Sequence, residues 1–350
     1  MIKNSESREL QAHFLKGIED IIPANTSLVN ELTDVLEISM DSAYRRMRGE
    51  TLLTIDEINR LCEHYRISFD AFTQVKSGMV TFSYSPLEPL AENFDLYHKS
   101  LLNELNFISS AKESKIIYAC QDIPVFHHYC FPELANFKVF YWKRSIMNIP
   151  ELAKAKYGSG IWFSEQLEIG QAIIEAYSRI PSIEIWTDNT IQSTIKQIKF
   201  YWDSGVFETR DDAIKVCHAL RREMRSIEKK AEFGSKEIPR AMWEEGSQEG
   251  NGHETGDNSG NYQVFVSDIE ITNNCVLVNV GSTQAVYLGH FSFSTMSTRN
   301  DTYCKKTEAW LSNIIRKSTL ISGVSEKQRY QFFRQIYDRI DQLILYIEKE

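Results

Sequence analysis

The 350-residue sequence has none of the long apolar runs that mark membrane proteins or secretion signals. No stretch reaches the roughly 18 apolar residues of a membrane-spanning helix. The opening residues, MIKNSESREL, are polar where a signal peptide is apolar. The six cysteines are scattered without a CxxC pair, which indicates reduced thiols and no disulfide framework. We therefore expect a cytoplasmic protein that makes no contact with a membrane.

Common motifs of nucleotide-binding enzymes are missing as well, because neither the P-loop pattern nor GxGxxG occurs. The most enzyme-like segment is CQDIPVFHHYC, which contains Cys120, His127, His128 and Cys130. Thiols and imidazoles serve as nucleophiles or zinc ligands. Adjacent histidines, however, diverge on a regular element, and buried free cysteine is usually inert packing. We therefore expect no catalytic residue, no metal ligand and no cofactor.

Basic residues are fewer than acidic ones: the sequence contains 39 Lys and Arg and 48 Asp and Glu, for a net charge of −9. Residues 1–76 contain nine basic and thirteen acidic residues, a net of −4. Nucleic-acid-binding domains are more often basic, because neutralising phosphates supplies most non-specific affinity. Any DNA binding must therefore depend on a local basic patch. Such a patch is present at Arg45, Arg46 and Arg48.

The spacing of apolar residues before position 80 predicts short helices. A stripe from Leu10 to Ile21 recurs every three or four residues and ends before Pro23. Ser27 is suited to cap a second helix and Ser39 a third, with a tight connection between them. On this third helix Ala43 and Met47 should face inward, which leaves the arginines outside.

The end of this region carries further helix signals. Gly49 is suited to the left-handed conformation that stops the third helix. Thr54 and Glu57 have the spacing of a capping box for a fourth helix, in which Ile55 begins the core face. Ser68 then caps a short fifth helix.

This pattern resembles the helix-turn-helix of the Cro/CI repressor class, the XRE family, over about Ser27 to Phe72. The resemblance rests on NELTDVLEIS, on the small Ala43, on RGE after the third helix and on LTIDEINRLCEHYRISFDAF. It implies a lambda-repressor-like, all-α domain of five helices at residues 1–76. It also implies that the third helix enters the DNA major groove, where base edges are distinguishable.

On this resemblance, side chains at the start of the recognition helix reach base edges and flanking groups hold phosphates. Met40, Asp41, Ser42 and Arg45 take the first role, and Arg46 and Arg48 the second. The backbone amides at the helix N-termini after Ser27 and Ser39 add phosphate sites. The alternative is a solvated face on which Asp41 and Glu50 pair with the arginines. The candidate DNA-binding residues are Ser27, Ser39, Met40, Asp41, Ser42, Arg45, Arg46 and Arg48.

Residues 77–86 read as a linker, and 87–350 as a larger α+β domain with a mixed or antiparallel sheet and flanking helices. SKIIYACQDIPVF and SIEIWTD predict strands separated by helical segments. YQVFVSDIEI, NCVLVNVG and QAVYLGHFSFS predict an antiparallel meander. Residues 244–260 are rich in glycine and acids without any apolar residue, so we expect a disordered loop.

Two features of the larger domain leave alternatives open. The last predicted helix carries an apolar stripe, which is either a dimer seam or packing on its own domain. Trp186 with Tyr201 and Trp202 either line a small-molecule cleft or fill the core.

These observations favour a sequence-specific transcriptional regulator that binds double-stranded operator DNA. A homodimer is expected, because one recognition helix buries too little surface for useful specificity. The larger domain would dimerise or sense a small-molecule effector. The alternative is a protein-interaction module that uses an acidic helical domain without DNA binding. An enzyme with a DNA-targeting domain is a third reading, supported only by the Cys/His segment.

Overall fold

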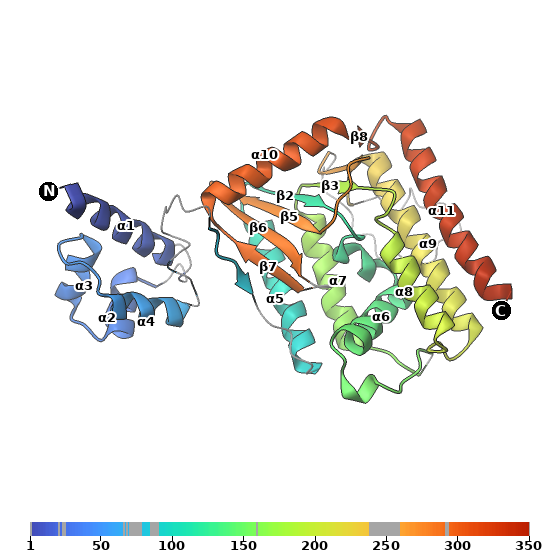
Figure 1. Ribbon diagram of the computed structural model, residues 1–350, viewed down its shortest axis with the longest axis horizontal. Coiled ribbons are helices and arrows are strands. Elements are labelled where there is room, and N and C mark those ends of the chain that lie inside the picture. Colours follow the sequence, from blue (N-terminus) through green and yellow to red (C-terminus); the bar gives the residue numbers. More distant parts are fainter. Residues whose placement is uncertain are drawn as a thin grey trace. The chain divides into compact units, whose positions relative to one another are not determined.

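The computed structural model describes residues 2–19, 22, 26–65, 67, 69, 79–84, 91–158, 160–237, 260–290 and 294–349. The chain forms two compact units, and Figure 1 shows their elements. One unit contains Met1–Tyr84 and Ser297–Tyr303, and the other contains Ser85–Met296 and Cys304–Glu350. Within the described ranges, every helix is too short or too polar to cross a membrane.

Helices make up most of the first unit, and their amphipathic spacing produces one small core. They are α1 Ile2–Glu19, α2 Leu28–Leu36, α3 Met40–Met47 and α4 Ile55–Tyr65 (Figure 1). The buried core residues are Phe14, Leu15, Ile18, Leu28, Val29, Leu32, Leu36, Ala43 and Leu61. Each helix buries one stripe against the others, as the apolar periodicity predicts.

One inward position in this unit was predicted wrongly, and the fifth helix stays a prediction. Ile55 is 85% exposed, because it is the first residue of α4 and precedes the turn that reaches the core. The predicted helix from Ser68 lies largely outside the described residues. Of that segment, Phe69 is described, and its ring packs edge-on against Phe14 at 5.2 Å between centroids.

The chain contains a mixed sheet, as the sequence predicts, with eight strands among the described residues. Its order is β1-β7-β6-β5-β2-β3-β4-β8. Strands β2, β3 and β4 are parallel, whereas β5 is antiparallel to both β2 and β6, and β8 is antiparallel to β4. The bounds are β1 Ser83–Tyr84, β2 Ser114–Ala119, β3 Ser182–Trp186, β4 Tyr262–Val266, β5 Cys275–Val280, β6 Thr283–His290, β7 Ser294–Thr298 and β8 Thr319–Leu320.

The predicted meander is correct for β5 and β6 but wrong for β4. Strands β5 and β6 form a hairpin whose last pair is Val280 with Thr283. Strand β4 instead pairs in parallel with β3, with Phe265 opposite Ile185. The two central strands β2 and β3 are buried and need a partner on each outer side. Consequently β4 and β5, neighbours in sequence, take opposite sides of that pair.

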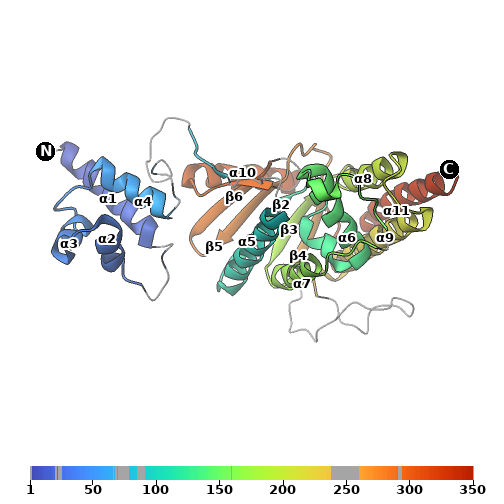
Figure 2. The ribbon, with the colours of Figure 1, turned by 90° about the horizontal axis from the view of Figure 1, so that it is seen from below.

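Helices cover both faces of this sheet. They are α5 Ala91–Ser110, α6 Pro132–Tyr141, α7 Ser164–Ser178, α8 Gln192–Asp203, α9 Arg210–Phe233, α10 Asp301–Lys317 and α11 Glu326–Lys349. Successive side chains of a strand point to opposite faces of the sheet, so Gln284 and Tyr287 of β6 lie on different faces. Gln284 donates a hydrogen bond to Glu308 on α10, and Tyr287 donates one to Glu104 on α5. Helices α10 and α5 therefore lie on opposite faces, as Figure 2 shows. Shorter helical turns are η2 Val125–Cys130, η3 Trp142–Ile146 and η4 Pro150–Leu152.

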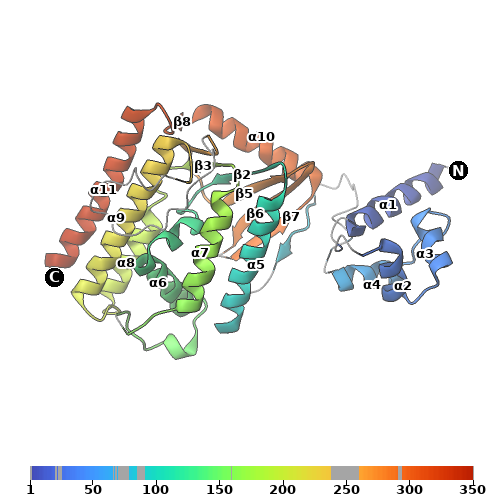
Figure 3. The same ribbon diagram turned by 180° about the vertical axis from the view of Figure 1, so that it is seen from behind.

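The two open alternatives have structural answers within this unit. Helix α11 runs beside α9 (Figures 1 and 3), and Phe333, Ile340 and Ile347 of its stripe are fully buried there. The stripe therefore packs on its own domain. Trp186 and Tyr201 are also fully buried, and Trp202 is partly buried against the same cluster, so these aromatic rings belong to the core. The predicted loop at 244–260 lies outside the described residues, apart from Gly260.

Candidate nucleic-acid interface

Helices α2 and α3 are joined by a tight three-residue turn, as the sequence predicts. Glu37 ends α2 in the left-handed conformation with φ +56°, and its N–H donates to the carbonyl of Thr33. The Ile38 N–H donates to the same carbonyl at 3.2 Å. Ser39 has an extended backbone and is the N-cap residue that immediately precedes α3. A left-handed residue other than glycine costs about 1–2 kcal/mol, so packing of the two helices must hold this turn.

The predicted helix signals around α3 are mostly present. The Ser39 hydroxyl accepts from the Ser42 N–H at 3.3 Å, and Gly49 has φ +67°. Thr54 and Glu57 exchange the two hydrogen bonds of a capping box, at 2.9 and 3.2 Å. Ser27 precedes α2 in extended conformation, but its side chain makes no capping hydrogen bond. The ends of α3 are thus set by local sequence.

The packing of Ala43 determines which side of α3 faces outward. Ala43 is completely buried, and Met47 packs against the same core. Met40 and Asp41 at the start of the helix are exposed, whereas Ser42 is half-buried. Of the arginines, Arg45 has 57% and Arg48 55% of its side chain exposed. The outward face therefore brings together most of the predicted base-reading positions with two guanidinium groups.

Arg46 differs from the expectation that it points outward. Only 14% of its side chain is exposed, and its guanidinium makes two hydrogen bonds to the carboxylate of Glu57, at 2.6 and 3.2 Å. A third bond runs to the carbonyl of Ser42. One turn after Ser42, Arg46 faces the first turn of α4, where Glu57 is fixed by the capping box. Its contacts are therefore those of a group that joins α3 to α4.

Arg45 and Arg48 also have carboxylate partners, which is the arrangement of the solvated-face alternative. Arg45 lies 3.0 Å from Asp41, and Arg48 lies 2.7 Å from Glu50. The hydrogen bond between the last two raises the pKa of Arg48 and lowers that of Glu50. Exposed pairs of this kind contribute little to stability. Either guanidinium can therefore exchange its carboxylate for another acceptor at small cost.

Two residues of this site escaped the sequence analysis. Buried Gln11 on α1 donates to the carbonyls of Arg46 and Thr51 at 2.7 and 2.9 Å, and accepts from the Leu53 N–H at 2.7 Å. A polar residue between Leu10 and Phe14 within an apolar stripe was the available signal. The other is Tyr44, an exposed aromatic residue on the outward face of α3.

The Cys/His segment forms a different structure. His127 lies 2.8 Å from the carboxylate of Glu184, and His128 lies 3.1 Å from that of Glu223. The adjacent imidazoles thus diverge to separate partners, as expected. Cys120 is fully buried, and burial raises the pKa of its thiol. Within the described ranges, no group of three His, Cys, Asp or Glu side chains is arranged to hold a metal ion.

Local sequence and packing thus account for the geometry of α3 and its outward face without reference to any relative. Comparisons with family models, with curated proteins and with solved structures gave no match.

Proposed function

We propose that this protein is a sequence-specific DNA-binding transcriptional regulator whose recognition helix is α3. The observation that carries the proposal is the outward face of α3. This face follows a three-residue turn from α2, and it exposes Arg45 and Arg48 while Ala43 anchors the helix to the core. An α-helix of this kind fits the major groove of B-DNA.

The proposal gives the outward residues separate roles. Arg45, in the middle of the helix, would reach a base edge, and a guanine is the usual partner of arginine. Met40 and Tyr44 would provide apolar contact beside it, for example to a thymine methyl group. Arg48, at the C-terminal end, would hold a phosphate. Arg46 would act indirectly, because its bonds to Glu57 orient α3.

The larger unit would join two chains into a dimer, so that two recognition helices contact the DNA. A single helix contacts too few bases for useful specificity, so a dimer with half-sites about one DNA turn apart is expected. A ligand bound by the larger unit would then change the relative placement of the two recognition helices. The family assignment to the XRE regulators belongs to the same proposal.

Selection of bound sequences from a random DNA pool, with the full chain, tests this function. We expect a palindromic consensus with half-sites roughly 10 base pairs apart. Arg45→Ala should then weaken consensus binding more than random binding, and Arg48→Ala should weaken both equally. Arg60→Ala, a change at an exposed arginine of α4, is the matched control and should change neither. A pool without enriched sequences would contradict the proposal.

A protein-interaction module is the second candidate, and one specific observation favours it. Both exposed arginines already have acidic partners, in a region whose net charge is −4. A salt titration with random DNA separates the two functions. Counterion release makes the logarithm of DNA affinity fall linearly with the logarithm of salt concentration. Absence of DNA binding even at low salt would favour the interaction module.

A further inference from the structure

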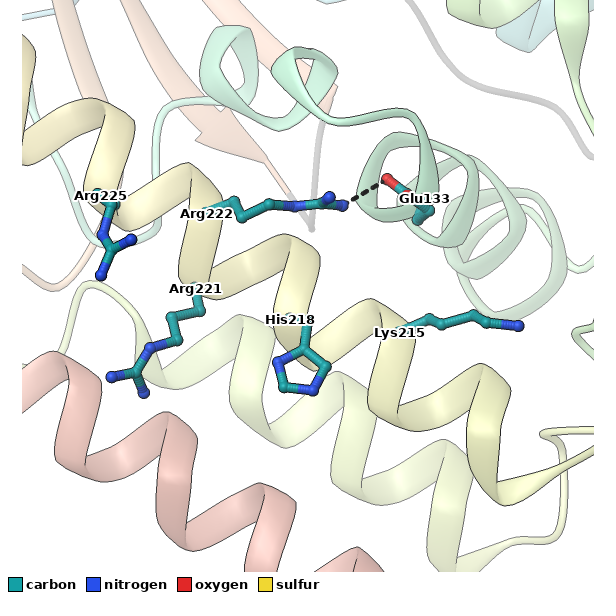
Figure 4. A pocket seen from close by; sticks show the side chains of 6 residues that line it. All are labelled: Glu133, Lys215, His218, Arg221, Arg222 and Arg225. Carbon is teal, nitrogen blue, oxygen red and sulfur yellow. Dashed lines mark hydrogen bonds and ion pairs between the residues drawn. The ribbon is translucent and has the colours of Figure 1, made fainter. Parts of the chain in front are cut away.

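Helix α9 carries a row of basic side chains on its outer face, in a protein whose net charge is −9. Lys215, His218, Arg222 and Arg225 recur at intervals of three and four residues, which places them along one side of the helix. Arg221 lies next to them, and Figure 4 shows all five side chains projecting from α9. The other side of α9 is fixed in the core through Ala219 and Leu220.

These side chains line a groove of about 320 Å³, to which α6 contributes Glu133. We call this the α9 groove, and its lining residues are Glu133, Lys215, His218, Arg221, Arg222 and Arg225. Small-molecule sites occupy about 300–1,000 Å³, so the groove has room for a compact ligand. Glu133 is its single acidic lining residue, against four permanent cations and one imidazole.

The cations of the groove are held in different ways. Arg222 lies 2.9 Å from Glu133, and Arg221 is bound to Asp341. Each guanidinium also lies against an aromatic ring, Arg222 at 5.3 Å from the centroid of Phe131 and Arg221 at 5.1 Å from that of Tyr337. These contacts orient planar groups of the kind that bind phosphate or carboxylate in a bidentate manner.

Two other groups of the groove, His218 and Arg225, are not held by a direct partner. Neither His218 nor Arg225 has a hydrogen bond or an ion pair with any residue in the described part of the chain. Arg221, Arg222 and Lys215 each have a carboxylate partner. His218 and Arg225 are therefore the groups that a bound anion would pair with first.

We propose that the α9 groove binds a small anion with at least two phosphate or carboxylate groups. One group would lie between Arg225 and Arg221, and the other near His218 and Arg222. The site lies in the larger unit and does not depend on DNA binding by α3.

Acidic residues at both ends of the row favour a small ligand over a long polyanion. Asp211 lies 2.5 Å from Lys215 at one end. Glu228 lies one turn beyond Arg225 at the other end and accepts a hydrogen bond from Tyr337. A nucleic-acid backbone that continued past the groove would meet these carboxylates, whereas a compact anion would meet only the positive centre.

Isothermal titration calorimetry on the full chain, in phosphate-free buffer, tests this site. The probes are inorganic pyrophosphate, adenosine diphosphate and citrate, which separate phosphate from carboxylate ligands. We expect at least one probe to bind once per chain with a submillimolar Kd. Arg225→Gln should weaken that binding about tenfold, the usual effect of losing one charged hydrogen bond. His218→Asn should weaken it less, and Glu133→Gln should strengthen it.

Arg334→Gln is the matched control, because it removes one exposed positive charge from α11 outside the groove. It should leave the Kd unchanged, and unaltered thermal unfolding of each variant would show that the fold is retained. The proposal is overturned if no probe binds, or if Arg334→Gln weakens binding as much as Arg225→Gln. It is also overturned if Arg225→Gln impairs random duplex DNA binding while probe binding is unchanged.

Discussion

The side chain of Arg46 shows how one residue can support the outward face of α3 without lying on it. Its guanidinium and the carboxylate of Glu57 are 14% and 15% exposed, so water screens the pair only partly. Burial alone would raise the pKa of Glu57, but hydrogen bonds from Arg46 and Thr54 outweigh this and lower it. The ionised carboxylate therefore stabilises the folded helical unit.

We predict that Arg46→Met destabilises the helical unit by about 1–2 kcal/mol at pH 7, through loss of charged hydrogen bonds. Because the folded-state pKa of Glu57 is lowered, its contribution is complete above the ordinary value of 4.5 and is lost as pH falls through the folded value. The difference between variant and wild type should therefore shrink below about pH 4.5. Urea unfolding at several pH values measures this.

Arg45→Met is the matched control for that experiment, because the Arg45 pair with Asp41 is exposed. It should change stability little while reducing the proposed affinity for DNA. Equal destabilisation by the two substitutions would show that the bonds between Arg46 and Glu57 have no special role.

At the scale of elements, the C-terminal end of α3 is held by groups from other helices. Gln11 from α1 bonds to the carbonyls of Arg46 and Thr51, and to the N–H of Leu53. These backbone groups lie at the end of α3 and in the connection to α4, where helical hydrogen bonding stops. One amide thus satisfies three backbone groups and fixes the direction in which α3 leaves the core.

We predict that Gln11→Leu destabilises the helical unit by about 1–3 kcal/mol, because the partly buried Thr51 carbonyl and Leu53 N–H lose their side-chain partner. Thermal unfolding monitored by circular dichroism measures the loss. Glu9→Leu, at an exposed position of the same helix, is the control and should have little effect. A Gln11→Leu protein with wild-type stability would show that water satisfies the three backbone groups instead.

At the scale of the whole molecule, the larger unit is organised around a buried carboxylate. Glu184 lies in the middle of β3, is completely buried and accepts four hydrogen bonds of 2.7–2.9 Å, from His127, Tyr177, Trp186 and Tyr262. Burial alone would raise the pKa of Glu184, but the imidazole and these hydrogen bonds lower it to about 2. The network joins η2, α7, β3 and β4.

We predict that Glu184→Gln destabilises the larger unit by about 3 kcal/mol, because a buried donor replaces an acceptor. The lowered pKa means that the wild-type advantage is present above the ordinary carboxyl pKa of 4.5 and declines as pH falls towards 2. Glu168→Gln, at an exposed position of α7, should change little. Urea unfolding at pH values from 7 down to about 2 tests the trend, and a difference that stays constant below pH 4.5 would contradict it.

The two units should also unfold separately, because each has its own core. In calorimetry of the full chain, we expect two transitions. Arg46→Met should lower the temperature of one transition and Glu184→Gln that of the other. A single transition shifted by both substitutions would show that the units unfold together.

Much of the fold could be predicted from local pattern. Apolar periodicity located α1 to α4 and the long helices of the larger unit, and capping chemistry placed the start of α3 at Ser39 and of α4 at Thr54. Helix α6 was not predicted, because its face from Leu134 to Phe140 is almost wholly buried and shows no amphipathic period. The position of β4 was wrong for a related reason, since local alternation does not specify which strand becomes a neighbour.

The sequence by itself determined where α3 begins and ends and which side Ala43 turns inward, because caps and helical periodicity act within a few residues. Only the tertiary structure decided that Arg46 faces Glu57 and that Glu184 meets His127. It also decided that the basic side chains of α9 surround one groove with Glu133. Each of these contacts joins residues from different elements, so each depends on how whole helices and strands pack.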